Sequence, residues 1–321
     1  MSAVRQPSYG DVTGEYLAAR GGAGLAAGSH DLTWVTGDDA VSFLDGQLSQ
    51  DIAAMEPGSI ARSLLLEPRG KLKALLWVLR GEDRVGLVSD RGQGAVVVEQ
   101  LERFRFRVDA TISLDGRPVA VLWGPGSADV LRAAGHVPPV GWRDEDQVLV
   151  AALPVGVPRY LTAGDAGLDA AGATPIGTIA ETAVRIEAGE PVMGIDVDES
   201  TIPQETGLVP EAVSFTKGCY LGQELVARID SRGRVNRHLR GIVLRDTVLP
   251  PPGAEVVSGG DPVGTITSVG ESMELRAPVA LAMVRREVEP GSGVEIRWAG
   301  GSASAEVRNL PLAAFGGSDT P

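Results

Sequence analysis

The ten residues from Phe215 to Glu224, FTKGCYLGQE, bring together the residue types in this chain that most often carry chemistry. They hold the single cysteine, Cys219, with Lys217 two positions before it and Gln223 shortly after it. A nearby cation can convert a thiol into a nucleophilic thiolate. A lone cysteine is also commonly a small, inert core residue, and no histidine lies nearby in sequence to act as its base. The pattern leaves both interpretations of Cys219 open.

Glu187 is a second candidate, because it falls in the last turn of a predicted helix that ends at Gly189. A carboxylate at that end opposes the helix dipole. One explanation is a surface side chain or an ion pair with Arg185. The other is a carboxylate that accepts two hydrogen bonds from adjacent N–H groups of a ligand heterocycle.

A basic stretch begins inside the cysteine motif and has a formal charge of +5 in a chain of −13. Its basic residues are Lys217, Arg228, Arg232, Arg234, Arg237, Arg240 and Arg245. The stretch is either a solvated connector or a site for an anionic ligand tail, since arginine binds carboxylates and phosphates well. Lys71 and Lys73 alternate on a predicted strand, so they share one face. They line either a solvent-facing hairpin edge or the mouth of a pocket.

Charge and composition exclude several classes of function. A net charge of −13 and 4% aromatic residues argue against a general nucleic-acid or anionic-membrane binder. One cysteine cannot supply a four-cysteine cluster, and the three histidines show no ligand spacing, so we expect no metal bound by the protein. No apolar run approaches the ~20 residues of a membrane span, and the N-terminus lacks the apolar core of a signal peptide. We expect a cytoplasmic monomer.

Periodicity predicts the elements that must position these residues. Residues 1–28, rich in Gly and Ala, are predicted to be a flexible arm. Residues 62–90 predict a three-stranded meander. Residues 119–135 repeat an earlier order of strand, turn and helix, which suggests two related α+β units. Residues 177–191 predict an amphipathic helix that begins with a Thr178–Glu181 capping box.

Near residue 236 the sequence pattern changes to short valine-rich runs that are broken by Pro-Pro and Gly-Gly pairs. This pattern is typical of a small β-barrel. The predicted organisation is therefore an arm over 1–28, a ligand-binding region of two α+β units over 29–235, and a barrel over 236–321. The predicted fold class is α+β.

Five segments resemble a known family. The octapeptide KGCYLGQE at 217–224 closely resembles the signature of the YgfZ family of folate-binding proteins, which are linked to iron–sulfur cluster assembly and repair. RIEAGEPVMGID at 185–196 and IPQE at 202–205 look like the preceding family segment. FLDGQLSQDI at 43–52 and LLLEPRGKLKALLWVL at 64–79 resemble its N-terminal landmarks. These other segments are shared with the related aminomethyltransferase, the T-protein of the glycine cleavage system.

The resemblance, which spans about residues 30–310, implies two ferredoxin-like α+β units and a C-terminal barrel around a folate channel. It implies tetrahydrofolate or a derivative as the cofactor, with Glu187 on the pterin and the basic stretch near the glutamate tail. The predicted chemical residues are Cys219 and Lys217. The predicted cofactor-binding residues are Glu187, Tyr220, Gln223, Glu224 and Arg228.

The sequence departs from the aminomethyltransferase where that enzyme carries an acidic pair with a catalytic aspartate, because Lys73 and Ala74 stand there. The leading hypothesis is therefore a folate-binding accessory protein without established turnover. It would act on client iron–sulfur proteins or their assembly factors, with Cys219 as the functional thiol. The alternative is a folate-dependent aminomethyltransferase or related one-carbon enzyme. A third possibility is a binding module that has lost folate.

Overall fold

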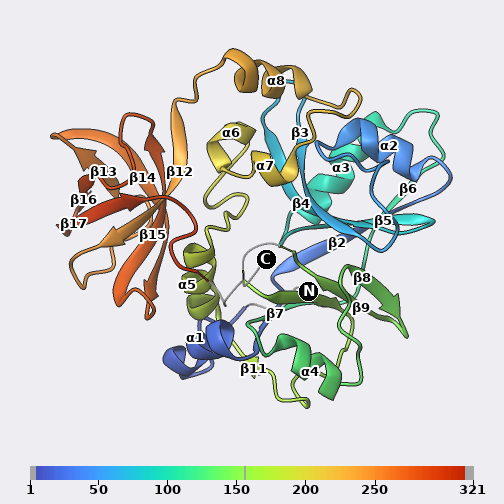
Figure 1. Ribbon diagram of the computed structural model, residues 1–321, viewed down its shortest axis with the longest axis horizontal. Coiled ribbons are helices and arrows are strands. Elements are labelled where there is room, and N and C mark those ends of the chain that lie inside the picture. The colour runs from blue at the N-terminus through green and yellow to red at the C-terminus, as the bar shows by residue number, and fades with distance from the viewer. Residues whose placement is uncertain (1–4, 155–156, 315–321) are drawn as a thin grey trace, which may run out of the picture.

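The computed structural model describes residues 5–154 and 157–314, which fold into two α+β units and a β-barrel (Figure 1). Helix α5 (Thr178–Ala188) lies between the barrel and the α+β units. The predicted fold class, an α+β chain with a C-terminal barrel, is confirmed. No helix in these ranges has the length and hydrophobicity needed to cross a bilayer.

The first unit is an antiparallel sheet in the order β3-β4-β5-β2-β6. Its strands are β2 (His30–Thr36), β3 (Ile60–Leu66), β4 (Leu72–Arg80), β5 (Arg84–Asp90) and β6 (Thr111–Leu114). Phe43 of α2 (Ala40–Gln47) and Leu101 of α3 (Gly94–Phe104) share a buried cluster with Val78 of the sheet. Strands β3, β4 and β5 confirm the meander predicted over 62–90.

The second unit is a sheet in the order β11-β1-β7-β10-β9-β8. Its strands are β1 (Gly24–Ala27), β7 (Val119–Trp123), β8 (Trp142–Glu145), β9 (Val148–Ala152), β10 (Arg159–Ala163) and β11 (Thr174–Pro175), with helix α4 (Ser127–Ala133). Trp77 of the first sheet shares a buried cluster with Trp123 and Leu161 of the second. The two sheets therefore pack against each other through large apolar side chains. Polar residues next to these side chains lie at the same interface.

The flexible arm predicted over 1–28 is wrong for the described residues of that range. Helix α1 (Val12–Gly21) begins after Asp11, whose side chain accepts a hydrogen bond from Gly14 N at 2.9 Å. Tyr16 and Ala19 are buried, and α1 contacts α5. Small residues allow α1 to pack closely, so a composition typical of a flexible segment forms part of the core. Residues 1–4 lie outside the described residues.

Helix α5 confirms the predicted amphipathic helix but not its predicted start. The capping residue is Gly177, one position before Thr178, and Glu181 forms an ion pair with Arg5 instead of closing a capping box. The helix ends at Gly189, which has a φ of 74° and lies in the left-handed region that glycine adopts easily.

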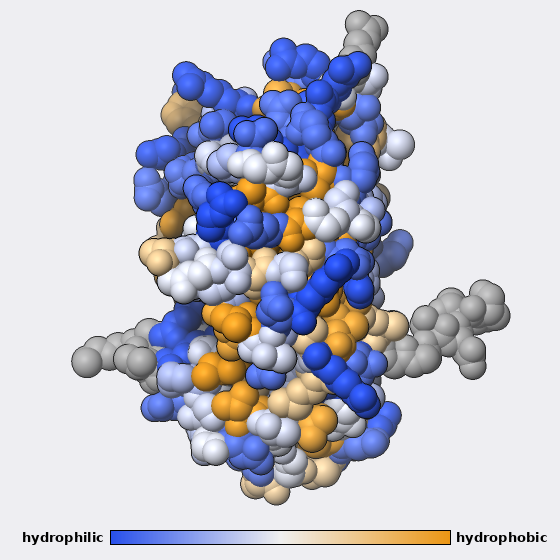
Figure 2. All heavy atoms as spheres, turned by 90° about the vertical axis from the view of Figure 1, so that its left-hand side faces the viewer, coloured by the Kyte–Doolittle hydropathy of each residue, from blue (hydrophilic) through white to orange (hydrophobic). Residues whose placement is uncertain are grey.

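The barrel closes in the order β12-β15-β14-β13-β16-β17. Its strands are β12 (Arg237–Leu244), β13 (Glu255–Ser258), β14 (Asp261–Ser272), β15 (Ala277–Arg285), β16 (Gly293–Trp298) and β17 (Gly301–Arg308). Ile242, Val256 and Ile296 fill its interior. Seen from the barrel side, hydrophobic residues gather on the lower part of the face, and the upper part is mainly hydrophilic (Figure 2). Short helices α6 (Pro203–Thr206) and α7 (Val209–Ala212), followed by α8 (Gln223–Arg232), connect the α+β region to the barrel.

Candidate functional site

A cavity of about 430 Å³ lies where the two sheets meet α5 and the segment that follows it. We call it the central pocket. Its walls come from strands β2 to β5 and β7, from Arg159 of β10, from α5, and from residues 190–195. A volume of this size suits a cofactor or small-molecule ligand, and a cleft between two packed units is a common place for one.

Two tryptophans and two arginines form one wall of the central pocket. The Arg62 guanidinium lies 4.3 Å from the ring centre of Trp77, and that of Arg159 lies 4.8 Å from that of Trp123. Glu190 links the arginines: it pairs with Arg62, and its Oε1 accepts a hydrogen bond from Arg159 Nη2 at 2.8 Å. Burial alone would raise the pKa of Glu190, but the two arginines outweigh it and lower that pKa to about 2. This wall is therefore rigid, charged and partly aromatic.

Several polar atoms of the pocket residues are buried without a hydrogen-bond partner among the described residues. They are Arg159 Nη1, Trp123 Nε1 and Ser89 Oγ; Arg62 Nε also makes no hydrogen bond, but it lies 3.2 Å from the carboxylate of Glu211. A buried donor that lacks a partner costs about 1–3 kcal/mol, and such atoms are few in native proteins. Two of the three can only donate. Each of these atoms has almost no accessible surface, so none of them opens onto the cavity, although the residues that carry them line it.

Asp90, at the end of β5, contributes a carboxyl group to the same pocket. Its Oδ2 accepts a hydrogen bond from Met193 N at 2.7 Å. Burial raises the pKa of Asp90 to about 7, against smaller opposing effects of this hydrogen bond and of Arg185. Directly opposite on β2 is His30, whose pKa burial and then the nearby Arg159 lower to about 4. The pocket thus holds a carboxyl group that changes charge near neutral pH beside a neutral imidazole.

Together these groups can bind a polar, planar heterocycle. The tryptophan wall supplies apolar contact area, the arginines suit ring carbonyls or anions, and a carboxylate suits ring N–H groups. Among the described residues, no three His, Cys, Asp or Glu side chains gather as a metal site would require.

Glu187 is not among the residues that line the central pocket. Its side chain is fully buried, and both of its oxygens are engaged by the protein. Tyr16 Oη donates to Oε1 at 2.5 Å, and Arg20 Nη1 donates to Oε2 at 2.6 Å. Burial, followed by the contact with Glu187, raises the pKa of Tyr16 to about 12. In the structure Glu187 therefore joins α5 to α1, and its predicted ligand contact stays a prediction. The contact with α1 explains why an acid is tolerated at the helix end.

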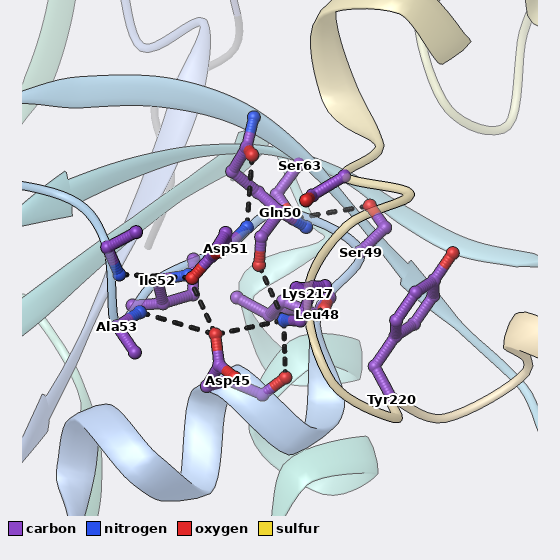
Figure 3. A network of polar contacts seen from close by, with 12 residues as sticks. Asp45, Leu48, Ser49, Gln50, Asp51, Ile52, Ala53, Ser63, Lys217 and Tyr220 are labelled. Atoms are coloured by element: carbon purple, nitrogen blue, oxygen red, sulfur yellow. Dashed lines mark hydrogen bonds and ion pairs between the residues drawn. The ribbon is translucent and has the colours of Figure 1, made fainter.

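Lys217 is a structural crosslink. Its side chain is only 1% exposed, and its Nζ donates to the backbone oxygens of Asp45, Leu48 and Gln50 at 2.6, 3.1 and 2.7 Å (Figure 3). It also pairs with the Asp45 carboxylate at 3.0 Å. An ammonium group has only three protons to donate, so all of them are used. Lys217 therefore holds the 45–50 segment against the cysteine motif, and its predicted chemical role stays a prediction.

The other motif residues also lie outside the lining of the central pocket. Cys219 is exposed, as are Glu224 and Arg228 on α8. Tyr220 is buried, and burial raises its pKa to about 12. Gln223 Oε1 accepts a hydrogen bond from Tyr220 N at 3.2 Å. The motif thus forms a loop packed on the first unit and leaves the thiol facing solvent.

Sequence reasoning missed the residues that do build the pocket: Asp90, Arg62, Arg159, Glu190 and the two tryptophans. Asp90 carried a usable signal, because it ends an apolar strand. Arg62 and Arg159 carried none, since each reads as an ordinary strand residue until the fold brings both to Glu190.

Comparisons with known proteins agree with this architecture. Residues 237–313 match the family model of the glycine cleavage T-protein C-terminal barrel domain. The chain is 30% identical to an aminomethyltransferase of Streptomyces coelicolor, covering 95% of this chain and 90% of the relative. It is 29% identical to one of Thermus thermophilus, covering 95% and 91%. The crystal structure of a glycine cleavage system aminomethyltransferase T from Bartonella henselae superposes with a TM-score of 0.89 at 25% identity, covering 98% and 93%. The narrower YgfZ assignment stays a prediction.

Proposed function

Because the chain belongs to the aminomethyltransferase family, we propose that it binds a reduced folate, tetrahydrofolate or a derivative, in the central pocket and transfers a one-carbon group of the aminomethyl type. The observation that carries this proposal is the combination, in one cavity, of a tryptophan and arginine wall with a carboxyl group at Asp90. A ligand of this class has a flat ring with both carbonyl and N–H groups, so it fits both the donors and the carboxyl group of the cavity.

The residues present fit such a ring. Arg62 and Arg159 would face its acceptors, Asp90 would bind its N–H groups, and Trp77 would contribute apolar surface. A reduced folate supplies a ring nitrogen that carries the one-carbon unit. Glu190 keeps both arginines in place, which fixes the donors before the ligand arrives.

In the proposed reaction, the protein supplies orientation, exclusion of water and one titratable carboxyl group. The tryptophans and the segment after α5 cover the ring. Asp90 can hold a proton on its carboxyl group at neutral pH, or accept one from a bound N–H, because its pKa lies near 7. Glu190 holds Arg62 and Arg159 in place, so the two guanidinium groups orient the ligand.

Binding and turnover test this proposal separately. Anaerobic calorimetry with tetrahydrofolate should show a single site in the wild type. Arg159→Leu should weaken binding about tenfold or more, whereas Arg132→Leu, an exposed position on α4, should not. Transfer from an aminomethyl-lipoyl donor then tests the chemistry. Binding without turnover would contradict the proposed transferase activity and leave folate binding standing. Absence of binding by the wild type would contradict both parts of the proposal.

A second candidate function is a folate-binding accessory protein for iron–sulfur cluster assembly or repair. Two observations favour it. Cys219 is exposed, where a thiol can meet a client protein or an assembly factor. Lys73 stands where the resemblance places the acidic pair, and its Nζ pairs with Glu199 at 2.8 Å outside the lining of the pocket. A Cys219→Ala strain should then lose activity of cluster-dependent enzymes under oxidative stress. Normal activity in that strain would remove the role of the thiol.

A further inference from the structure

Asp90 differs from the other acidic residues that line the central pocket. Glu181 pairs with Arg5, and Glu190 is shared by Arg62 and Arg159. Asp90 has no cationic partner among the described residues and makes a single hydrogen bond, with Met193 N. An unpaired carboxyl group in a buried setting is costly when ionised. Its position in the lining of the cavity leaves room for a ligand to complete its contacts.

The groups around Asp90 determine how it responds to pH. Arg185 on α5 favours its ionised form, whereas Glu190 and Asp196, from the segment after α5, oppose it. His30 lies directly opposite on β2. The pKa of His30 is lowered to about 4 and that of Glu190 to about 2. Neither His30 nor Glu190 changes charge between about pH 6 and pH 8. Asp90 is therefore the group expected to titrate in this range.

We infer that Asp90 is the specificity-determining residue of the central pocket, where its carboxylate binds the N–H edge of the ligand heterocycle, so that ligand affinity rises as Asp90 loses its proton. The inference rests on the proposed folate function and adds a selective contact to it. The guanidinium groups of Arg62 and Arg159 in the pocket wall suit acceptors, whereas Asp90 binds donors. The pocket therefore selects a ring with N–H groups on one edge and a carbonyl on another.

The sign and size of the pH effect follow from the ionised fraction. A carboxyl group with a pKa of about 7 is about one tenth ionised at pH 6 and about nine tenths ionised at pH 8. A ligand that donates N–H hydrogen bonds needs the ionised form. Its dissociation constant should therefore fall about tenfold from pH 6 to pH 8. The carboxylates of folate ionise near pH 4, so they contribute little to this change.

The test is an anaerobic titration of tetrahydrofolate into wild type, Asp90→Asn and Asp83→Asn at about pH 6 and about pH 8. Asp83 is an exposed residue next to the other end of β5, so its variant controls for the loss of a carboxylate. The wild type and Asp83→Asn should show the tenfold rise in affinity. Asp90→Asn should bind at least tenfold more weakly at pH 8 and equally at both pH values. Thermal unfolding checks that each variant is folded.

Two results would overturn the inference, and they are distinguishable. Binding by the wild type that is equally tight at both pH values removes the role of Asp90 and leaves the folate proposal standing, even if Asp90→Asn does not fold. Absence of binding by the wild type at both pH values removes the folate proposal and this inference together.

Discussion

At the residue scale, the structure offers a second carboxylate for the chemistry predicted at Glu187. Tyr16 and Arg20 engage both side-chain oxygens of Glu187, whereas Asp90 lines the cavity and has no ion-pair partner among the described residues. Local sequence could not distinguish them, because the partner Arg20 lies 167 positions away along the chain. The cysteine motif could be recognised from its residues, but the sequence did not show that the motif lies outside the lining of the central pocket.

Glu190 should stabilise the fold through the arginines that it links. Glu190→Gln leaves the buried Arg159 without its counter-charge and Arg62 with Glu211 alone, and should lower the free energy of unfolding by about 3 kcal/mol at neutral pH. Because the pKa of Glu190 is lowered from 4.5 to about 2, its contribution is present above about pH 4.5 and is lost as pH falls towards 2. In urea unfolding, the difference in the free energy of unfolding between wild type and Glu190→Gln should therefore narrow as the pH falls from about 4.5 towards 2.

Glu82→Gln, in the exposed turn between β4 and β5, is the control and should match the wild type within about 0.5 kcal/mol. A Glu190→Gln protein as stable as this control would contradict the linking role.

Lys217 should matter for stability and not for ligand binding. Lys217→Met leaves three backbone oxygens without their donor and should cost about 2 kcal/mol. Lys73→Met removes a pair with an exposed glutamate and should cost less than about 1 kcal/mol. Thermal unfolding and tetrahydrofolate titration measure the two effects. A stable Lys217→Met protein that fails to bind folate would restore a direct role for this lysine.

At the element scale, periodic patterns predicted the meander and helix α5 well, because each buries one continuous apolar face. Two predictions failed because a neighbouring segment decides them. Helix α1 forms from a Gly- and Ala-rich stretch because Tyr16 and Ala19 pack against the core. Gly177, and not Thr178, is the N-cap of helix α5, because the side chain of Glu181 pairs with Arg5 and does not close a capping box.

Helix α8 begins at a glycine that its surroundings require. Gly222 has a φ of 81°, and an added Cβ would lie 2.6 Å from Glu67 O in the turn between β3 and β4. Gly222→Ala should therefore destabilise the protein by about 2 kcal/mol. Gly218→Ala, in the same motif with no atom within 4 Å of the added Cβ, should change stability by less than about 1 kcal/mol. Equal unfolding midpoints for the two variants would show that the turn can move aside.

At the scale of the whole molecule, α5 joins the parts. Its N-terminal half lines the central pocket, and Glu187 near its end binds α1 through Tyr16 and accepts a hydrogen bond from Leu312 N beyond the barrel at 2.8 Å. The overall α+β and barrel organisation was predictable, because each part has its own periodicity and resembles known segments. The pocket was not, since its walls come from strands and a helix far apart in the sequence.

The central claim is that the ligand binds beside Asp90 and not at Glu187 or the cysteine motif. The most direct test is calorimetric titration of tetrahydrofolate at about pH 8 into Asp90→Asn, Glu187→Gln and Cys219→Ala, each compared with the wild type. We predict affinities within about twofold of the wild type for Glu187→Gln and Cys219→Ala, and a loss of at least tenfold for Asp90→Asn. Retained binding in a folded Asp90→Asn protein, with binding lost in Glu187→Gln, would contradict the account.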